Sequence, residues 1–75
     1  MKLYLIQQDE NDDYDTYDSY IVAAKSSKAA QSMIPLSEPP FGNWAYTLEA
    51  VKVTEIGLAK DGTEEGVILG SYNAG

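Results

Sequence analysis

Residues 2–24, KLYLIQQDENDDYDTYDSYIVAA, decide the fold of this chain. The first seven of them alternate Leu3 and Leu5 against polar neighbours, while Tyr4 and Ile6 add bulk to the second face, which is typical of a strand. Residues 9–18 are rich in the Asp, Asn and Thr of turns, and a β-branched and aromatic run then resumes. The stretch therefore predicts a β-hairpin, with strands at 2–8 and 19–24 and a long acidic loop between them.

A short helix is expected next. Ser26 or Ser27 can cap it, since a serine oxygen accepts a bond from an early helical amide, and Pro35 stops it after Ile34. A helix of about eight residues is marginal alone in water, so it should dock an apolar face onto the sheet. That face carries Ala30, Met33 and Ile34.

Two further strands are predicted in the second half of the chain. Thr47 to Ile56 is rich in valine and threonine. A turn at 60–62 precedes the run from Gly66 to Tyr72, whose unbroken Val-Ile-Leu sequence indicates a strand that is buried on both faces. Residues 36–43, with two prolines and a glycine, form a structured loop.

The order ββαββ predicts an α+β fold, with a small antiparallel sheet of about four strands and one short helix packed on one face. The chain of 75 residues is expected to be a single domain, 1–75. A sheet this small leaves open edges, which invites a homodimer formed by strand pairing at a sheet edge. The core candidates are Leu3, Leu5, Ile21, Ala23, Ala30, Met33, Val51, Val53, Val67 and Leu69.

Composition limits the chemistry that the chain can perform. It has no cysteine and no histidine, so the commonest metal ligands and the commonest general base are missing, and Ser26, Ser27 and Ser71 have no histidine to activate them. No glycine-rich loop leads into a helix to cradle a phosphate. We therefore expect a protein that is not an enzyme, with no catalytic residues, no metal and no cofactor.

Charge restricts the partners. The net charge is −7, the five cationic residues are all lysine, and the sequence pI is near 4.1. Nucleic acid and anionic membranes need cationic residues to neutralise phosphate, so neither is an expected direct partner. The apolar runs are too short to span a bilayer and no signal-peptide core follows Met1, which predicts a cytoplasmic protein. A basic protein surface is the expected large partner.

Three segments carry a resemblance: residues 14–19 (YDTYDS), residues 22–24 (VAA), and residues 66–75 (GVILGSYNAG). They resemble a family of small phage and prophage proteins. The resemblance spans nearly the whole length and is least clear over residues 31–46. It implies an accessory role for a phage in the cytoplasm of a bacterial host, and no particular chemistry.

Six of the twelve acidic residues lie within residues 9–18, among tyrosines. Carboxylates mixed with aromatic rings suit contact with a basic partner. A solvated hairpin loop without further role is the alternative. The candidate partner-binding residues are Asp12, Asp13, Tyr14, Asp15, Tyr17 and Asp18.

Two other interpretations of this tract are weaker. Asp9, Asn11 and Asp13 alternate as in the first half of an EF-hand loop, but Tyr14 stands where that loop needs glycine and Tyr20 where it needs a bidentate glutamate. Nucleic-acid mimicry needs more charge, because alternate acids on a strand lie about 6.6 Å apart against one charge per about 1.7 Å of duplex. Mimicry would require Glu38, Glu49, Glu55, Glu64 or Glu65 to join the tract.

The loop of residues 39–46, PPFGNWAY, holds the only phenylalanine and the only tryptophan. A small domain usually uses such residues to close its core, so Trp44 is expected to be buried, with Phe41 less important. The opposing interpretation makes one of the two an exposed anchor at an interface.

The leading hypothesis is a phage accessory protein that binds and inhibits a bacterial host protein, a defence factor such as a CRISPR effector. The alternative is an oligomeric sponge that sequesters a nucleotide immune signal with Lys25, Lys28, Lys52 and the aromatic loop. A structural role in the virion ranks third.

Overall fold

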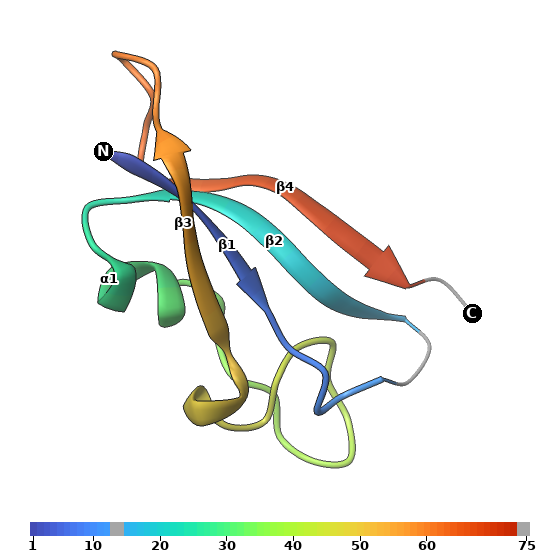
Figure 1. Cartoon of the computed structure of the whole chain (residues 1–75). Coiled ribbons are helices and arrows are strands. Elements are labelled where there is room, and N and C mark those ends of the chain that lie inside the picture. Colours follow the sequence, from blue (N-terminus) through green and yellow to red (C-terminus); the bar gives the residue numbers. More distant parts are fainter. Residues whose placement is uncertain (13–14, 74–75) are drawn as a thin grey trace.

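The computed structural model describes residues 1–12 and 15–73 and contains a four-stranded antiparallel sheet with one α-helix (Figure 1). The strands are β1 (Lys2–Gln7), β2 (Thr16–Ala24), β3 (Lys52–Leu58) and β4 (Gly66–Asn73), and the helices are α1 (Ser27–Gln31) and the 3-10 turn η1 (Leu48–Ala50). The α+β class expected from the sequence is confirmed.

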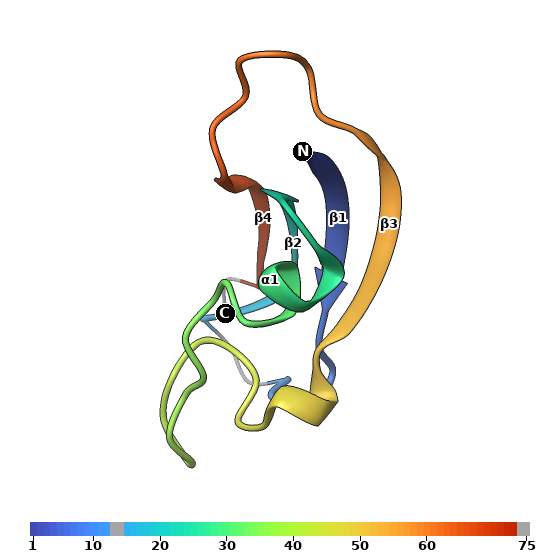
Figure 2. The same ribbon diagram turned by 90° about the vertical axis from the view of Figure 1, so that its left-hand side faces the viewer.

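The spatial order of the strands, β3-β1-β2-β4, differs from their order in the sequence. The β1–β2 hairpin forms the centre, β3 pairs with β1, and β4 pairs with β2. The segment 59–65 arches over one end of the sheet to join the two outer strands, and the β1–β2 loop lies at the opposite end (Figures 1 and 2). The expected turn at 60–62 is present in this arch, where the Thr63 amide donates to the Lys60 carbonyl at 3.0 Å.

The helix is shorter than the sequence predicts. Its N-cap is Ser26, whose hydroxyl accepts a bond from the Ala29 amide at 3.1 Å. It ends at Gln31, and not at Ile34, because Ser32 leaves the helical conformation with φ −99° and ψ 9°, and the Met33 amide bonds the Ala30 carbonyl at 3.2 Å, three residues back and not four. The helix packs on β1, β2 and β3, in front of the sheet in Figure 2.

The third strand also begins later than the sequence predicts, because its first expected residues form η1.

The hydrophobic core lies on the face of the sheet that the helix covers. Its buried members are Tyr4, Ile6, Val22, Ala24, Ala30, Trp44, Ala45 and Val51. Met33 and Val53 pack against it and are half-buried. Of the core candidates, Ala30 and Val51 are therefore confirmed as buried core residues.

The choice of face was wrong for the first two strands. Tyr4 and Ile6 face the core together with Val22, whereas Leu3, Leu5 and Ile21 are only half-buried and belong to the second face. Both faces of β1 are apolar, so the alternation of residues alone does not determine which face is buried. The buried face is the one that packs with Trp44. Ala23 is buried, as expected, but on this second face.

The prediction that the fourth strand is buried on both faces was also wrong. Val67, Ile68 and Leu69 are 49%, 52% and 63% exposed. β4 is an outer strand beside β2, and the helix packs on the other three strands, β1, β2 and β3.

Candidate partner-binding site

The site begins at Gln8, which closes the base of the acidic loop. Its side-chain amide donates to the carbonyls of Asn11 and Tyr17, at 2.9 and 2.8 Å, and its Oε1 accepts from the Asn11 amide at 2.8 Å. Gln8 is buried, so these bonds are shielded from competing water. The acidic loop, residues 8–15, is therefore tied to the end of the sheet by a glutamine.

Asn11 joins this loop to the aromatic loop, residues 39–46. Its Nδ2 donates to the Trp44 carbonyl at 2.9 Å and to the Gly42 carbonyl at 3.3 Å. The Tyr17 amide adds a backbone bond to the Asn43 carbonyl at 2.9 Å. Two segments that are far apart in the sequence thus form one end of the molecule (Figure 1).

Glu10 makes a second connection between the same two regions. Its Oε2 accepts from the backbone amides of Tyr46 and Thr47, at 2.9 and 3.1 Å. Such charge-assisted bonds are among the stronger hydrogen bonds in proteins. Glu10 is consequently a structural carboxylate within the acidic tract.

The aromatic loop separates its two large rings. Trp44 is fully buried, which confirms the expectation that it is a core residue, whereas Phe41 is 81% exposed. Ser37 fixes the loop: its Oγ accepts from the Trp44 amide at 3.0 Å and its amide donates to the Ala45 carbonyl at 2.9 Å. Phe41 is thus presented to solvent by a loop whose backbone is bonded on both sides.

Gly42 is required in this loop for two reasons. Its φ is +123°, a region that L side chains rarely adopt, and an added Cβ would overlap the Ser37 side chain. The peptide bond between Pro39 and Pro40 is cis. The Phe41 amide donates to the Glu38 carbonyl at 2.9 Å, which places Glu38 in the same turn as the exposed ring.

Four aromatic rings form a row from the core to the edge of the sheet. Trp44 meets Tyr20 edge-on with centroids 5.0 Å apart, Tyr20 stacks on Tyr17 at 4.7 Å, and Tyr17 contacts Tyr72 at 4.8 Å. Gly70 leaves space for this row, since a Cβ there would lie 2.9 Å from both Tyr17 and Tyr20. Tyr17, a predicted binding residue, therefore packs part of its ring against other side chains of the same chain.

The pKa values of two tyrosine hydroxyl groups in this row are raised. Burial raises the pKa of Tyr20 above its ordinary value, and neighbouring Tyr17 adds to the shift. Partial burial also raises the pKa of Tyr72. The second cause is the hydrogen bond that its hydroxyl donates to Asp15 Oδ1 at 3.1 Å, which favours the protonated form. Asp15 thereby connects the acidic loop to β4.

The other predicted binding residues are distributed as follows. Asp12, Asp15 and Asp18 are exposed, and Asp13 and Tyr14 lie outside the described residues. Asp15 has a φ of +63°, a left-handed conformation that Asp and Asn tolerate. Asp18 is the extra residue of a bulge in β2, because Tyr17 pairs with Tyr72 and Ser19 pairs with Ser71.

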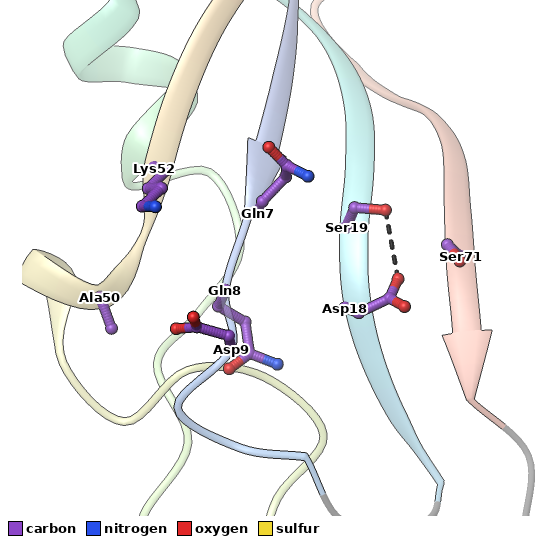
Figure 3. A pocket seen from close by; sticks show the side chains of 8 residues that line it. All are labelled: Gln7, Gln8, Asp9, Asp18, Ser19, Ala50, Lys52 and Ser71. Carbon is purple, nitrogen blue, oxygen red and sulfur yellow. Dashed lines mark hydrogen bonds between the residues drawn. The ribbon is translucent and has the colours of Figure 1, made fainter.

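A hollow of about 310 Å³ lies beside Asp18 on the second face of the sheet (Figure 3). It is lined by Gln7, Gln8, Asp9, Asp18, Ser19, Ala50, Lys52 and Ser71. Two carboxylates and a single ammonium group make it a poor site for a nucleotide phosphate.

Lys25 and Lys52, two of the lysines of the proposed nucleotide sponge, lie at opposite ends of β1. Lys52 pairs with Gln7 at one end of β1, whereas Lys25 follows Ala24, which pairs with Lys2 at the other end. A phosphate site that uses both Lys25 and Lys52 would need more than one chain.

Of the alternating tract Asp9-Asn11-Asp13, Asp9 and Asn11 do not present their side chains to the same surroundings, and Asp13 lies outside the described residues. Asn11 is buried and its Nδ2 is used for two carbonyls, while Asp9 is exposed. Within residues 1–12 and 15–73, no group of three acidic side chains is placed to hold a metal ion.

Comparison with family models, with curated proteins and with solved structures gives no match for this chain. None of the helices in the described ranges is long and apolar enough to cross a bilayer.

Sequence reasoning identified the acidic tract and the aromatic loop but did not bring them together. The connection depends on Asn11, which the sequence pattern offers only as an EF-hand-like position, and on Glu10, which it offers only as one of the acidic residues. A signal for Asn11 was present, since a lone amide among carboxylates at a loop is suited to bond backbone carbonyls.

Proposed function

We propose that this protein binds a basic surface of another protein through the end formed by the acidic loop and the aromatic loop. The observation that carries the proposal is the combination at this end of an exposed phenylalanine, on a loop bonded at both sides, with exposed carboxylates. Phe41 is 81% exposed, and Asp12, Asp15 and Glu38 are exposed as well.

Each part has a distinct physical role in this proposal. The carboxylates attract a cationic surface and accelerate encounter, since complementary charge acts mainly on the association rate. The aromatic ring supplies the short-range energy, because a few large side chains usually contribute most of the binding free energy. Fixing the ring in advance lowers the ordering cost of binding.

A protein contact is favoured over mimicry of a phosphate backbone. Of the acids that mimicry would need, Glu38 lies at this end, but Glu64 and Glu65 belong to the arch at the opposite end of the sheet, and Glu10 of the tract itself is occupied by backbone amides. Glu64 and Glu65 cannot join the tract, so even with Glu38 the charge at this end stays sparse compared with duplex DNA. An apolar anchor surrounded by separate charges fits a folded basic protein better.

The resemblance to phage proteins gives the proposal its biological setting. In that setting the protein is a non-enzymatic inhibitor in the cytoplasm of a bacterial host, and its target is a host protein, a defence factor such as a CRISPR effector. Inhibition would follow if the contacted basic surface is the one that the target uses for nucleic acid.

Affinity capture from bacterial lysate tests this proposal. Wild-type protein and Phe41→Ala are used as baits at low salt, with Leu36→Ala as a control because Leu36 is also exposed and precedes the aromatic loop. We expect a basic protein that the wild type and Leu36→Ala retain, and that Phe41→Ala loses or binds at least about tenfold more weakly. Equal retention by all three baits would remove Phe41 from the site.

A further inference from the structure

The outer edge of β4 carries no charged side chain, which is unusual for a strand at the edge of a sheet. Residues 66–73 contain no charged residue and no proline, and Val67, Ile68 and Leu69 all have about half of their surface in water. Edge strands in monomeric proteins are commonly protected by charges, proline, a bulge or a covering element, because an unprotected edge pairs with another strand. Of these devices β4 has a bulge at Ile68 and no charge or proline. This edge has apolar side chains on both faces and no such charge.

The opposite edge of the sheet shows the protection that β4 lacks. β3 carries Lys52 and Glu55, both exposed, and Glu55 forms an ion pair with Lys2 at 3.1 Å. Each outer strand contains one bulge residue, Ile56 in β3 and Ile68 in β4, which are 48% and 52% exposed. The two edges therefore differ mainly in charge.

The sequence of β4 is self-complementary. Gly66-Val67-Ile68-Leu69-Gly70 is nearly symmetric in residue size about its centre, since Val67 and Leu69 differ by one methylene group. In an antiparallel pair of two copies related by a two-fold axis at Ile68, glycine lies opposite glycine, valine opposite leucine, and Ile68 opposite itself. Aliphatic pairs directly opposite each other stabilise a sheet, and symmetric dimers are the commonest oligomers.

We infer that the protein forms a symmetric homodimer in which β4 pairs antiparallel with β4 of a second copy, centred on Ile68. The pairing joins two four-stranded sheets into one of eight strands. An uncharged strand is the part of an acidic chain where a second copy can approach with the least repulsion.

Charge near the ends of the strand gives this dimer a distinctive salt dependence. With Ile68 opposite Ile68, Glu64 of one copy lies beside Tyr72 of the other, and Tyr72 is bonded to Asp15. Like charges thus approach at both ends of the pair, between chains of net charge −7. Salt screens that repulsion, so the dimer should become stronger as ionic strength rises.

The inference is independent of the proposed function and adds to it. Because the paired strands run in opposite directions, the two partner-binding ends of the dimer point away from each other. The dimer would be a bivalent binder.

Sedimentation of the pure protein tests the inference. A single strand pair is a small interface, so we expect a weak dimer that dissociates over about 10 μM to 1 mM, with at least about threefold tighter association in high salt than in low salt. Ile68→Lys sets two ammonium groups opposite each other and should weaken the dimer at least tenfold. Ile56→Lys, the matched change on β3, should leave it intact.

A second variant keeps the test valid if the lysine variant does not fold. The chain has no cysteine, so Ile68→Cys introduces a single thiol. Residues directly opposite in an antiparallel pair are about 4.5 to 5.5 Å apart at Cα, within the range that a disulfide spans. Mild oxidation should covalently join most Ile68→Cys chains and few Ile56→Cys chains. A wild type that stays monomeric throughout, or equal behaviour of the variants at 56 and 68, would overturn the inference.

Discussion

Phe41 and Trp44 are three residues apart and have opposite environments, which illustrates how single positions define this molecule. Trp44 is fully buried under the sheet, while Phe41 is exposed at the tip of the same loop. The backbone between them is fixed by Asn11 and Ser37. One ring therefore contributes to stability and the other is available for a partner.

The two alanine variants should separate these roles. Trp44→Ala should cost about 3 to 5 kcal/mol, a large part of the roughly 4 to 11 kcal/mol expected for a chain of this length. Phe41→Ala should change the free energy of unfolding by less than about 0.5 kcal/mol. Thermal unfolding followed by circular dichroism measures both. A Trp44→Ala protein that unfolds like the wild type would contradict its place in the core.

Asn11 is the residue on which the two loops depend. In Asn11→Asp, a carboxylate would face the carbonyl oxygens of Trp44 and Gly42, and both donated bonds would be lost. A buried group left unpaired costs about 1 to 3 kcal/mol, and more when it is charged. We therefore expect this isosteric change to lower the free energy of unfolding by at least about 2 kcal/mol at neutral pH.

Asp12→Asn is the matched control, because it is the reverse exchange at the next, exposed position. It should change stability by no more than about 0.5 kcal/mol. Urea denaturation of the two variants measures the difference. Similar midpoints for both would show that the bonds of Asn11 do not hold the loops together.

At the scale of elements, the sequence predicts the types of the strands and of the helix but not which face of β1 is buried. Leu3 and Leu5 are as apolar as Tyr4 and Ile6, so local alternation leaves the choice to long-range packing with Trp44. The Val-Ile-Leu run of β4 predicts a strand that is buried on both faces, and the prediction is wrong because hydrophobicity does not distinguish a buried strand from an exposed edge strand. Likewise, the acidic tract was visible in the sequence, but its link through Asn11 to residues about thirty positions away was not.

The aromatic row between β2 and β4 predicts a pH dependence. Burial raises the pKa of Tyr20 in the folded state above its value of 10.0 in the unfolded chain, so folding favours the neutral hydroxyl. This contribution to stability is complete below that value and is lost as pH rises through the folded pKa. The melting temperature should therefore fall as the solution becomes alkaline.

Tyr20→Phe keeps the ring and removes the ionisable group. Between about pH 9 and about pH 11.5 the melting temperature of this variant should fall less than that of the wild type, because Tyr17 and Tyr72 can ionise in both proteins and only the wild type ionises at position 20 as well. A series of melting curves across this range measures both. Parallel decreases would show that the ionisation of Tyr20 is not coupled to folding.

At the scale of the whole molecule, charge and length separate the two ends. The longest dimension is 38 Å, several times the Debye length of about 8 Å at physiological ionic strength. A partner at the acidic and aromatic loops therefore senses little of the charge on the arch at 59–65. The site depends on where the carboxylates are, and not only on the net charge of −7.

The central claim is that the partner binds at the acidic and aromatic loops. It is tested most directly by measuring the dissociation constant of the captured partner for two variants that lose the same number of charges. The first variant changes Asp12, Asp15 and Asp18 to Asn, and Asn suits the positive φ of Asp15. The second changes Asp61 to Asn and Glu64 and Glu65 to Gln, which removes the same three charges from the arch. At low salt we expect the first variant to bind at least about tenfold more weakly and the second within about twofold of the wild type. Equal losses in both variants, or none in the first, would contradict a binding site at the acidic and aromatic loops.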